Sequence, residues 1–136
     1  MTNSPRGNTV EKRDIVGEPV AVSSLEAEGR NLSLAEFESR AVLRGEIHEL
    51  ITTAEAVGPG DTVRDVAYVG FFEVSQGGSL RIGDVLRQNS VAIGRLAGFD
   101  LTHMPNHLNI VITSEKRRTG KDLNLRLTDE IRFTLE

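Results

Sequence analysis

Residues 77–100 read GGSLRIGDVLRQNSVAIGRLAGFD, and this stretch decides the fold class. Short apolar runs alternate with turn residues in the order turn, strand, Gly-Asp, strand, turn, strand. Gly83, Gly94 and Gly98 are spaced through the stretch, and glycines at such intervals allow short strands to coil and to turn corners. The pattern therefore predicts short strands that curve into a small β-barrel.

The flanking sequence continues this pattern. Apolar residues alternate over residues 44–53, and further strands are predicted over residues 15–25, 63–74, 107–113 and 123–135. Pro19 lacks a donor for strand pairing, so the first strand is expected at a sheet edge or with a bulge. Gly70 indicates a bulge within residues 63–74.

One segment favours a helix. Ser33-Leu34-Ala35-Glu36 has the form of a capping box, and the apolar residues that follow it have helical spacing, which predicts a short helix from Leu34 to about Arg40. A strand that runs on into residues 45–50 is the competing interpretation. Overall composition and pattern predict a mainly β fold, a small closed or partly open β-barrel of about six to eight strands with one short helix.

Length and composition indicate the class of protein. A chain of 136 residues fits one domain, which we expect over residues 15–136, with the polar residues 1–14 as a flexible tail. The absence of cysteine excludes disulfides, thiolate nucleophiles and Cys-ligated metals. No signal-like or membrane-spanning run is seen, so we expect a soluble, cytoplasmic protein with no membrane partner. A formal charge of −4, with five Phe, one Tyr and no Trp, argues against nucleic acid as a partner.

All three histidines lie in two short motifs. His48 is in GEIHEL, residues 45–50, and His103 and His107 are in FDLTHMPNHLNIVI, residues 99–112. No other part of the chain concentrates so many groups that exchange protons or bind metals. We therefore predict that the two motifs meet in the folded protein and build one site in a shared, partly dry pocket.

Pro105 decides how His103 and His107 can be used. The His-x3-His spacing would place both rings on one face of a helix, but a proline between them removes a helical hydrogen bond. We therefore expect a loop over residues 99–106 that carries His103 and delivers His107 to the start of a strand. Two interpretations stay open: the rings converge on a substrate or a metal, or both are hydrogen-bonded structural residues.

GEIHEL predicts a carboxylate and an imidazole on one strand face, since Glu46, His48 and Leu50 alternate with Ile47 and Ile51. Such a pair can act as a base and the group that orients it. With the other two histidines it would also suit one divalent transition metal. The alternative is that this face is the solvated side of the sheet and neither residue is functional.

Further polar residues are candidates for the same site. Glu73 follows two phenylalanines, and an inward Glu73 would be desolvated, which suits a general acid or base. Asp100 is expected to bond loop amides in an Asx-type turn. Asn106, Asn109 and Tyr68 are candidates for binding substrate, although holding the loop is the commoner role for such asparagines.

Other motifs exclude common reaction classes. The basic run KRRTGK, residues 116–121, lacks the upstream glycine and the strand-to-helix context of a phosphate-binding loop, so we expect an exposed hairpin turn there. Recognition of an anion is a second interpretation of this run. The chain contains no Gly-x-Ser-x-Gly and no Gly-x-Gly-x-x-Gly motif, which argues against hydrolase-type acyl transfer and against hydride transfer from a Rossmann-bound cofactor.

Two resemblances add to this reading. GSLRIGDVL and IGRLAGFD resemble a segment of the six-stranded barrels of translation-factor second domains and riboflavin-synthase-like folds, which implies barrel architecture alone. GExHEL and GFDxxxHxPNHxNI are similar to the recurring stretches of a small uncharacterised family of single-domain bacterial proteins. That second resemblance spans residues 46–133 and implies a link to specialised metabolism.

The leading hypothesis is a small cofactor-independent enzyme that performs acid–base chemistry on a small metabolite, as an isomerase, cyclase or lyase. His48 or His107 would be the base, with His103, Glu46 and Glu73 as further catalytic candidates. The alternatives are a metal-dependent enzyme that uses His48, His103, His107 and Glu46 as ligands, and a non-catalytic binding or accessory module. An edge strand over residues 15–25 would also allow a homodimer.

Overall fold

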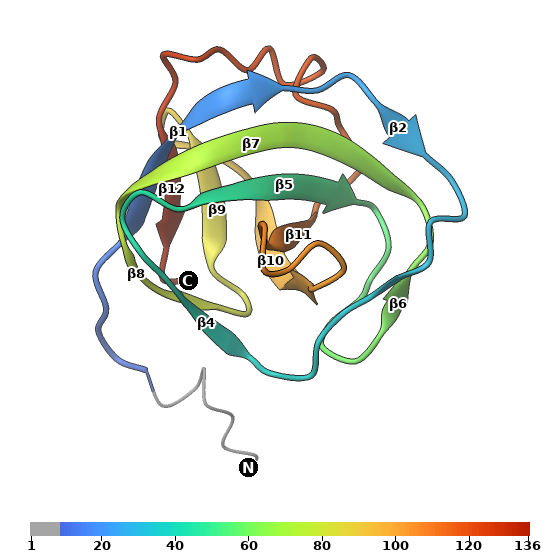
Figure 1. Ribbon diagram of the computed structural model, residues 1–136, viewed down its shortest axis with the longest axis horizontal. Helices are drawn as coiled ribbons and strands as arrows, with labels where there is room; N and C mark the ends of the chain where they lie inside the picture. The colour runs from blue at the N-terminus through green and yellow to red at the C-terminus, as the bar shows by residue number, and fades with distance from the viewer. Residues whose placement is uncertain (1–8) are drawn as a thin grey trace.

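The computed structural model describes residues 9–136 and is mainly β, with no helix among these residues (Figure 1). The strands are β1 Ile15–Val22, β2 Glu26–Ala27, β3 Leu32–Ser33, β4 Ser39–Val42, β5 Ile47–Thr53, β6 Thr62–Val63, β7 Val66–Gln76, β8 Gly78–Arg81, β9 Val85–Gln88, β10 Val91–Asp100, β11 Asn109–Thr113 and β12 Ile131–Thr134. The predicted mainly β class is therefore confirmed. None of these residues forms a helix with the length and hydropathy required to cross a membrane.

Seven strands pair in a closed ring, in the order β1-β12-β9-β10-β11-β5-β7, and the pairing of β1 with β7 completes it (Figure 1). All neighbours in the ring are antiparallel except β11 and β5, which are parallel. Strand β2 adds to β7, and two short pairs, β3 with β6 and β4 with β8, lie outside the ring order. The parallel pair matters for the site because it joins the two histidine motifs.

The ring has apolar side chains on both faces of β5 and β11. Successive residues of a strand point to opposite faces, so Leu50 and Ile110 join the main core whereas Ile51 and Val111 join a second cluster. The second cluster is completed by Leu32, Leu34 and Val63 from the segments outside the ring and by Val66 at the start of β7. Both faces of this pair are therefore largely shielded from water.

The bulge predicted at Gly70 is present in β7. Leu50 pairs with Gly70 while Ile51 pairs with Tyr68, so one residue of β7 is unpaired with β5. Gly70 has a φ of 144°, and a Cβ at this position would overlap the carbonyl oxygen of Ala21 in β1. The extra residue changes which side chains of β7 face inward after the bulge. As a result Glu73 is exposed on the outside, and the desolvation that an inward position would give does not occur.

The helix predicted from Leu34 to Arg40 is wrong. Leu34 forms a β-bridge with Asp100 and is buried in the second cluster, and β4 begins at Ser39. The amide of Ala35 donates to the carbonyl of Phe99 at 2.8 Å. The local capping signal is thus overridden by pairing with β10, and the competing interpretation, a strand that leads towards residues 45–50, describes this segment better.

The N-terminal part of the predicted domain makes more contacts with the ring than the sequence indicated. Pro19 lies where β1 pairs with β7 alone and where a register shift occurs, but Val16 and Gly17 pair with strands on both sides. Lys12 forms an ion pair with Asp84 at 2.9 Å, so this part of the predicted tail lies against the ring. The rest of that tail, residues 1–8, lies outside the described residues.

The basic run at residues 116–121 is not the predicted exposed hairpin turn. Thr119 and Gly120 are buried, and the amide and carbonyl of Arg118 both hydrogen-bond the hydroxyl of Thr52. Arg117 forms ion pairs with Glu26 and with Glu28 beside β2. The backbone of Arg118 and the side chain of Arg117 therefore fasten the long connection between β11 and β12 to β5 and to the β2 segment.

Candidate functional site

The two histidine motifs lie side by side, as predicted. Asn109 of β11 pairs with Glu49 of the parallel strand β5, and the amide of Leu108 donates to Nδ1 of His48 at 3.0 Å. The three rings, however, lie on two faces of these strands. His48 points inward with Leu50, whereas the side chains of Glu49 and His107 meet on the outer face.

His48 has a structural environment. Because Nδ1 accepts from Leu108, Nε2 carries the proton and donates to Oε1 of Glu46 at 3.1 Å. Burial alone would raise the pKa of Glu46, but hydrogen bonds from the Leu43 amide and from His48 lower it. The ring is 5 % exposed and both of its nitrogens are engaged, so it ties β5 to the segment before β11.

His107 lies on the outer face in a polar setting. Its Nδ1 is 2.9 Å from the amide nitrogen of Asn106, which can only donate, so the neutral ring carries its proton on Nε2. Nε2 lies 3.7 Å from Oε1 of Glu49. The ring stacks on His103 and meets the edge of Phe71, with 5.0 Å between ring centroids in each case.

The pKa values of this pair are shifted towards each other. Burial raises the pKa of Glu49, although the positive charges of His103 and Arg30 oppose the shift. Burial also lowers the pKa of His107, and the charge of His103 lowers it further, while the nearby Asn109 raises it. A carboxylate and an imidazole with converging pKa values can exchange protons with a substrate at neutral pH.

Two buried polar atoms beside Glu49 lack a hydrogen-bond partner among the described residues. They are Nε2 of His107 and the side-chain oxygen of Asn109, and a polar contact between these two side chains raises the pKa of His107. The amide nitrogen of Asn109 donates to Asp100 at 2.9 Å. Buried polar atoms are normally paired, so these two atoms mark a polar point behind the outer face of β5 and β11 that a small molecule reaches only if the side chains around it move.

Asp100 and Tyr68 complete the surroundings. Asp100 accepts from the hydroxyl and, at 3.4 Å, the amide of Thr102, which is the predicted loop-holding role. Burial raises the pKa of Tyr68, and the negative charges of Glu49 and Asp100 raise it further, whereas Arg30 opposes them. Tyr68 therefore lies close to the carboxylates of the site rather than in bulk solvent.

A pocket of about 340 Å³ opens beside His107 and is lined by Gly45, Ile47, Phe71, Asn106 and His107. It gives a small molecule access to one side of the imidazole. His107, His103, Asn106, Asn109 and Tyr68 of the predicted site therefore lie in one region. His48 and Glu46 belong to the structural tie, and Glu73 is exposed on the outer surface opposite Ile47, next to the pocket but outside its lining.

Sequence reasoning missed Glu49. Glu49 shares a strand face with Ile47 and Ile51. A carboxylate on an otherwise apolar strand face is the signal that could have identified it. Among residues 9–136, no group of three or more His, Asp or Glu side chains is placed to hold a metal ion. The arrangement instead offers an imidazole, a carboxylate and polar groups that orient them.

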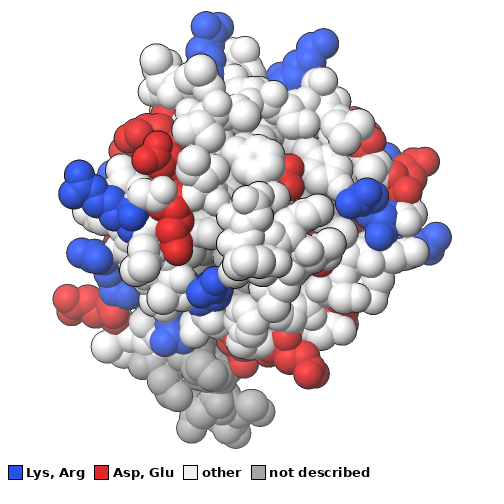
Figure 2. All heavy atoms as spheres, in the orientation of Figure 1, with Lys and Arg blue, Asp and Glu red and all other residues white. Residues whose placement is uncertain are grey.

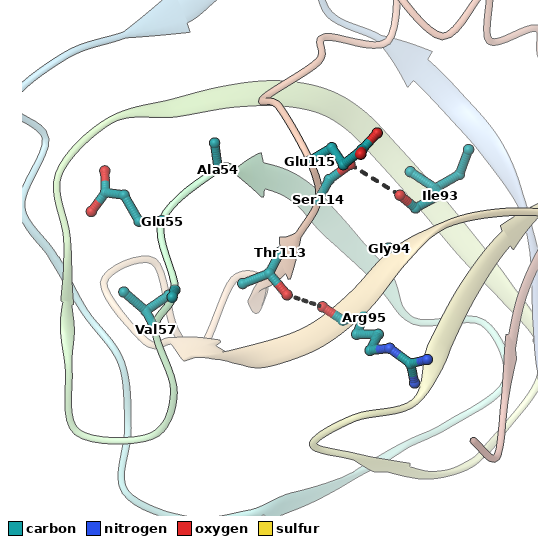
Figure 3. A pocket seen from close by; sticks show the side chains of 10 residues that line it. Ala54, Glu55, Val57, Ile93, Gly94, Arg95, Thr113, Ser114 and Glu115 are labelled. Carbon is teal, nitrogen blue, oxygen red and sulfur yellow. Dashed lines mark hydrogen bonds between the residues drawn. The ribbon is translucent and has the colours of Figure 1, made fainter.

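A larger hollow of about 600 Å³ lies at the ends of β5, β10 and β11 (Figure 3). Its hydroxyl groups are already used, because Thr113 donates to the carbonyl of Arg95 and Ser114 to that of Ile93. The carboxylate of Glu55 accepts from the amides of Arg64 and Asp65. These groups maintain the local backbone, so we place the candidate site at His107 instead.

A family model matches residues 9–134, a range that includes both histidine motifs and Glu49. The chain belongs to a family of unknown function, DUF6917. The predicted membership of a small uncharacterised family is confirmed to this extent. Comparisons with curated proteins and with solved structures gave no match. The resemblance to translation-factor barrels and the link to specialised metabolism therefore stay predictions.

Proposed function

We propose that this member of DUF6917 is a small cytoplasmic enzyme that catalyses proton transfer on a small metabolite without a cofactor, as an isomerase, cyclase or lyase. The observation that carries the proposal is the meeting of Glu49 and His107, 3.7 Å apart, beside a pocket. Their side chains are 13 % and 11 % exposed, so both are sheltered from bulk water, and His107 lines the pocket. The motif resemblance supports a search for substrates among specialised metabolites.

The tautomer of His107 assigns the roles. Since Nδ1 accepts from Asn106, the proton lies on Nε2, and because this atom is buried, its donation to a carbonyl oxygen of the substrate requires the ring to turn towards the pocket that it lines. Glu49 has free lone pairs and a raised pKa, which suits it to accept the proton from the adjacent carbon. The electron pair of the broken C–H bond then forms an enolate whose oxygen accepts the hydrogen bond from Nε2. The carbonyl re-forms when Glu49 returns its proton to another carbon; in an elimination the enolate instead expels a leaving group, which takes that proton.

His103 and Asn109 support this step in different ways. His103 stacks on His107, and burial together with this neighbour lowers the pKa of His107, which favours the neutral imidazole that donates through Nε2. The unpaired oxygen of Asn109 can accept from a hydroxyl group next to the substrate carbonyl. A hydroxycarbonyl compound would therefore satisfy both atoms that lack partners.

The test measures exchange of carbon-bound hydrogen in D₂O by ¹H NMR across a panel of small hydroxycarbonyl metabolites. We expect loss of the α-proton signal of at least one compound, and about a 100-fold slower rate with Glu49→Gln or His107→Asn, the usual size of an acid–base contribution. The matched control is Glu115→Gln, since this exposed carboxylate follows the far end of β11 and does not line the pocket. An unchanged rate in Glu49→Gln would sink the proposed mechanism.

A further inference from the structure

A second pocket lies on the other side of the loop that carries His103. It has a volume of about 400 Å³ and is lined by Phe37, Ser39, Arg40, Leu101 and Met104. None of these residues lines the pocket beside His107. The two pockets therefore use different residues of the same loop, and occupation of one does not require the other.

The floor of this pocket is firmly held but exposes apolar surface. Phe37 stacks on the buried Phe99, with 5.4 Å between ring centroids, and Met104 packs against the main core. Phe37 is nevertheless 38 % exposed and Leu101 is 41 % exposed. Figure 2 shows that the centre of the face carrying β4 is formed largely by uncharged side chains, with acidic and basic groups gathered around it.

Arg40 is the one charged residue in the pocket lining. Within residues 9–136 its guanidinium makes a single hydrogen bond, 3.4 Å long, to the carbonyl of Ala41, and no ion pair. The acid that it influences is Glu46, whose carboxylate is already bound by the Leu43 amide and by His48. Most of the donors of Arg40 therefore remain available at the edge of an apolar surface.

We propose that this pocket binds a small amphipathic carboxylate. Its aliphatic or aromatic body would contact Phe37, Leu101 and Met104, and its carboxylate would receive a forked hydrogen bond from Arg40. A planar carboxylate matches one guanidinium, and the bond between them is charge-assisted. An apolar floor with few placed polar groups is typical of small-molecule sites.

Octanoate and 1-octanol, which share the same chain length, are suitable probes for the full chain. Titration followed by ¹H–¹⁵N NMR should show saturable octanoate binding with shifts at Phe37 and Leu101, and about tenfold weaker binding of octanol. Arg40→Gln should reduce octanoate affinity about tenfold and leave octanol binding unchanged, because it removes one charged contact. Arg44→Gln is the matched control, since this exposed arginine is outside the pocket lining.

Leu101→Ser should weaken the binding of octanoate and of octanol by the same factor. Thermal unfolding of each variant shows whether its fold is intact. Equal affinity for octanoate and octanol, an unchanged octanoate affinity in Arg40→Gln, or no binding at millimolar octanoate would overturn it. Concentration-dependent dimerisation that Leu101→Ser abolishes would also overturn it, by assigning the surface to a second copy. None of these outcomes depends on Glu49 or His107.

Discussion

At the scale of the residue, His107 is the side chain whose surroundings most clearly oppose protonation. Burial lowers its pKa below the ordinary value of 6.5, and the positive charge of the stacked His103 lowers it further. We predict that His103→Gln raises the pKa of His107, because the substitution removes a like charge 5.0 Å away between ring centroids. A pH titration of the His107 ring C–H signals by NMR measures this directly.

The lowered pKa of His107 also makes the free energy of unfolding depend on pH. The folded state holds the proton on His107 less tightly than the unfolded state, so the contribution of this residue is complete above pH 6.5 and is lost as pH falls from that value through the lower pKa of the folded state. His107→Gln should therefore show a smaller loss of unfolding free energy between pH 7 and pH 5.5 than the natural protein. An identical loss in both would contradict the assignment.

Single residues show where prediction from sequence stops. Alternation over residues 46–50 correctly placed the side chains of Glu46 and His48 on one face, and the hydrogen bond between them confirms it. Alternation does not reveal which face of a strand is covered, and the face of His48 is the interior one. Glu49 was missed for the same reason, since its partner Asn109 is 60 residues away in sequence and depends on the parallel pairing.

At the scale of the element, the bulge in β7 sets the outward position of Glu73. We predict that Gly70→Ala destabilises the protein by about 2–3 kcal/mol, because the added methyl would overlap the Ala21 carbonyl at a φ of 144°. Urea unfolding followed by far-ultraviolet circular dichroism measures the change. Gly58→Ala is the control, since a Cβ there meets no atom within 4 Å, and an equal effect of both substitutions would contradict this role for the bulge.

The elements also divide into those that local sequence determines and those that it does not. Glycine-punctuated apolar runs predicted β8, β9 and β10 because turn chemistry and strand alternation act over a few residues. The segment around Leu34 failed because its capping box competes with a bridge to Asp100, a contact with distant sequence. Residues 123–135 were predicted as one strand, but only Ile131–Thr134 find a partner strand.

At the scale of the whole molecule, closure of the ring depends on both ends of the chain. Strand β1 lies between β12 and β7, so the N-terminal and C-terminal strands complete the ring together (Figure 1). The segment before β1 is held by Lys12, which reaches Asp84 in the turn between β8 and β9. Their side chains are 8 % and 1 % exposed, so this ion pair is almost completely removed from water.

We predict that Lys12→Met lowers the free energy of unfolding at pH 7 by about 3 kcal/mol, because it leaves the Asp84 carboxylate buried without its cation. Burial already raises the pKa of Asp84 despite the opposing effect of Lys12, and loss of Lys12 should raise it further. A raised folded-state pKa means that the folded protein gains stability relative to the unfolded chain as pH falls through it. The deficit of Lys12→Met relative to the natural protein should therefore shrink between pH 7 and pH 5.

Two comparisons isolate the ion pair from the loss of a long side chain. Lys116→Met removes an exposed lysine and should change the unfolding free energy by less than about 0.5 kcal/mol. Adding Asp84→Asn to Lys12→Met should restore part of the stability, because the remaining buried group is then uncharged. If the deficit of Lys12→Met were independent of pH and the double variant were no more stable, the segment would be held by packing alone and the ring would close without this charge pair.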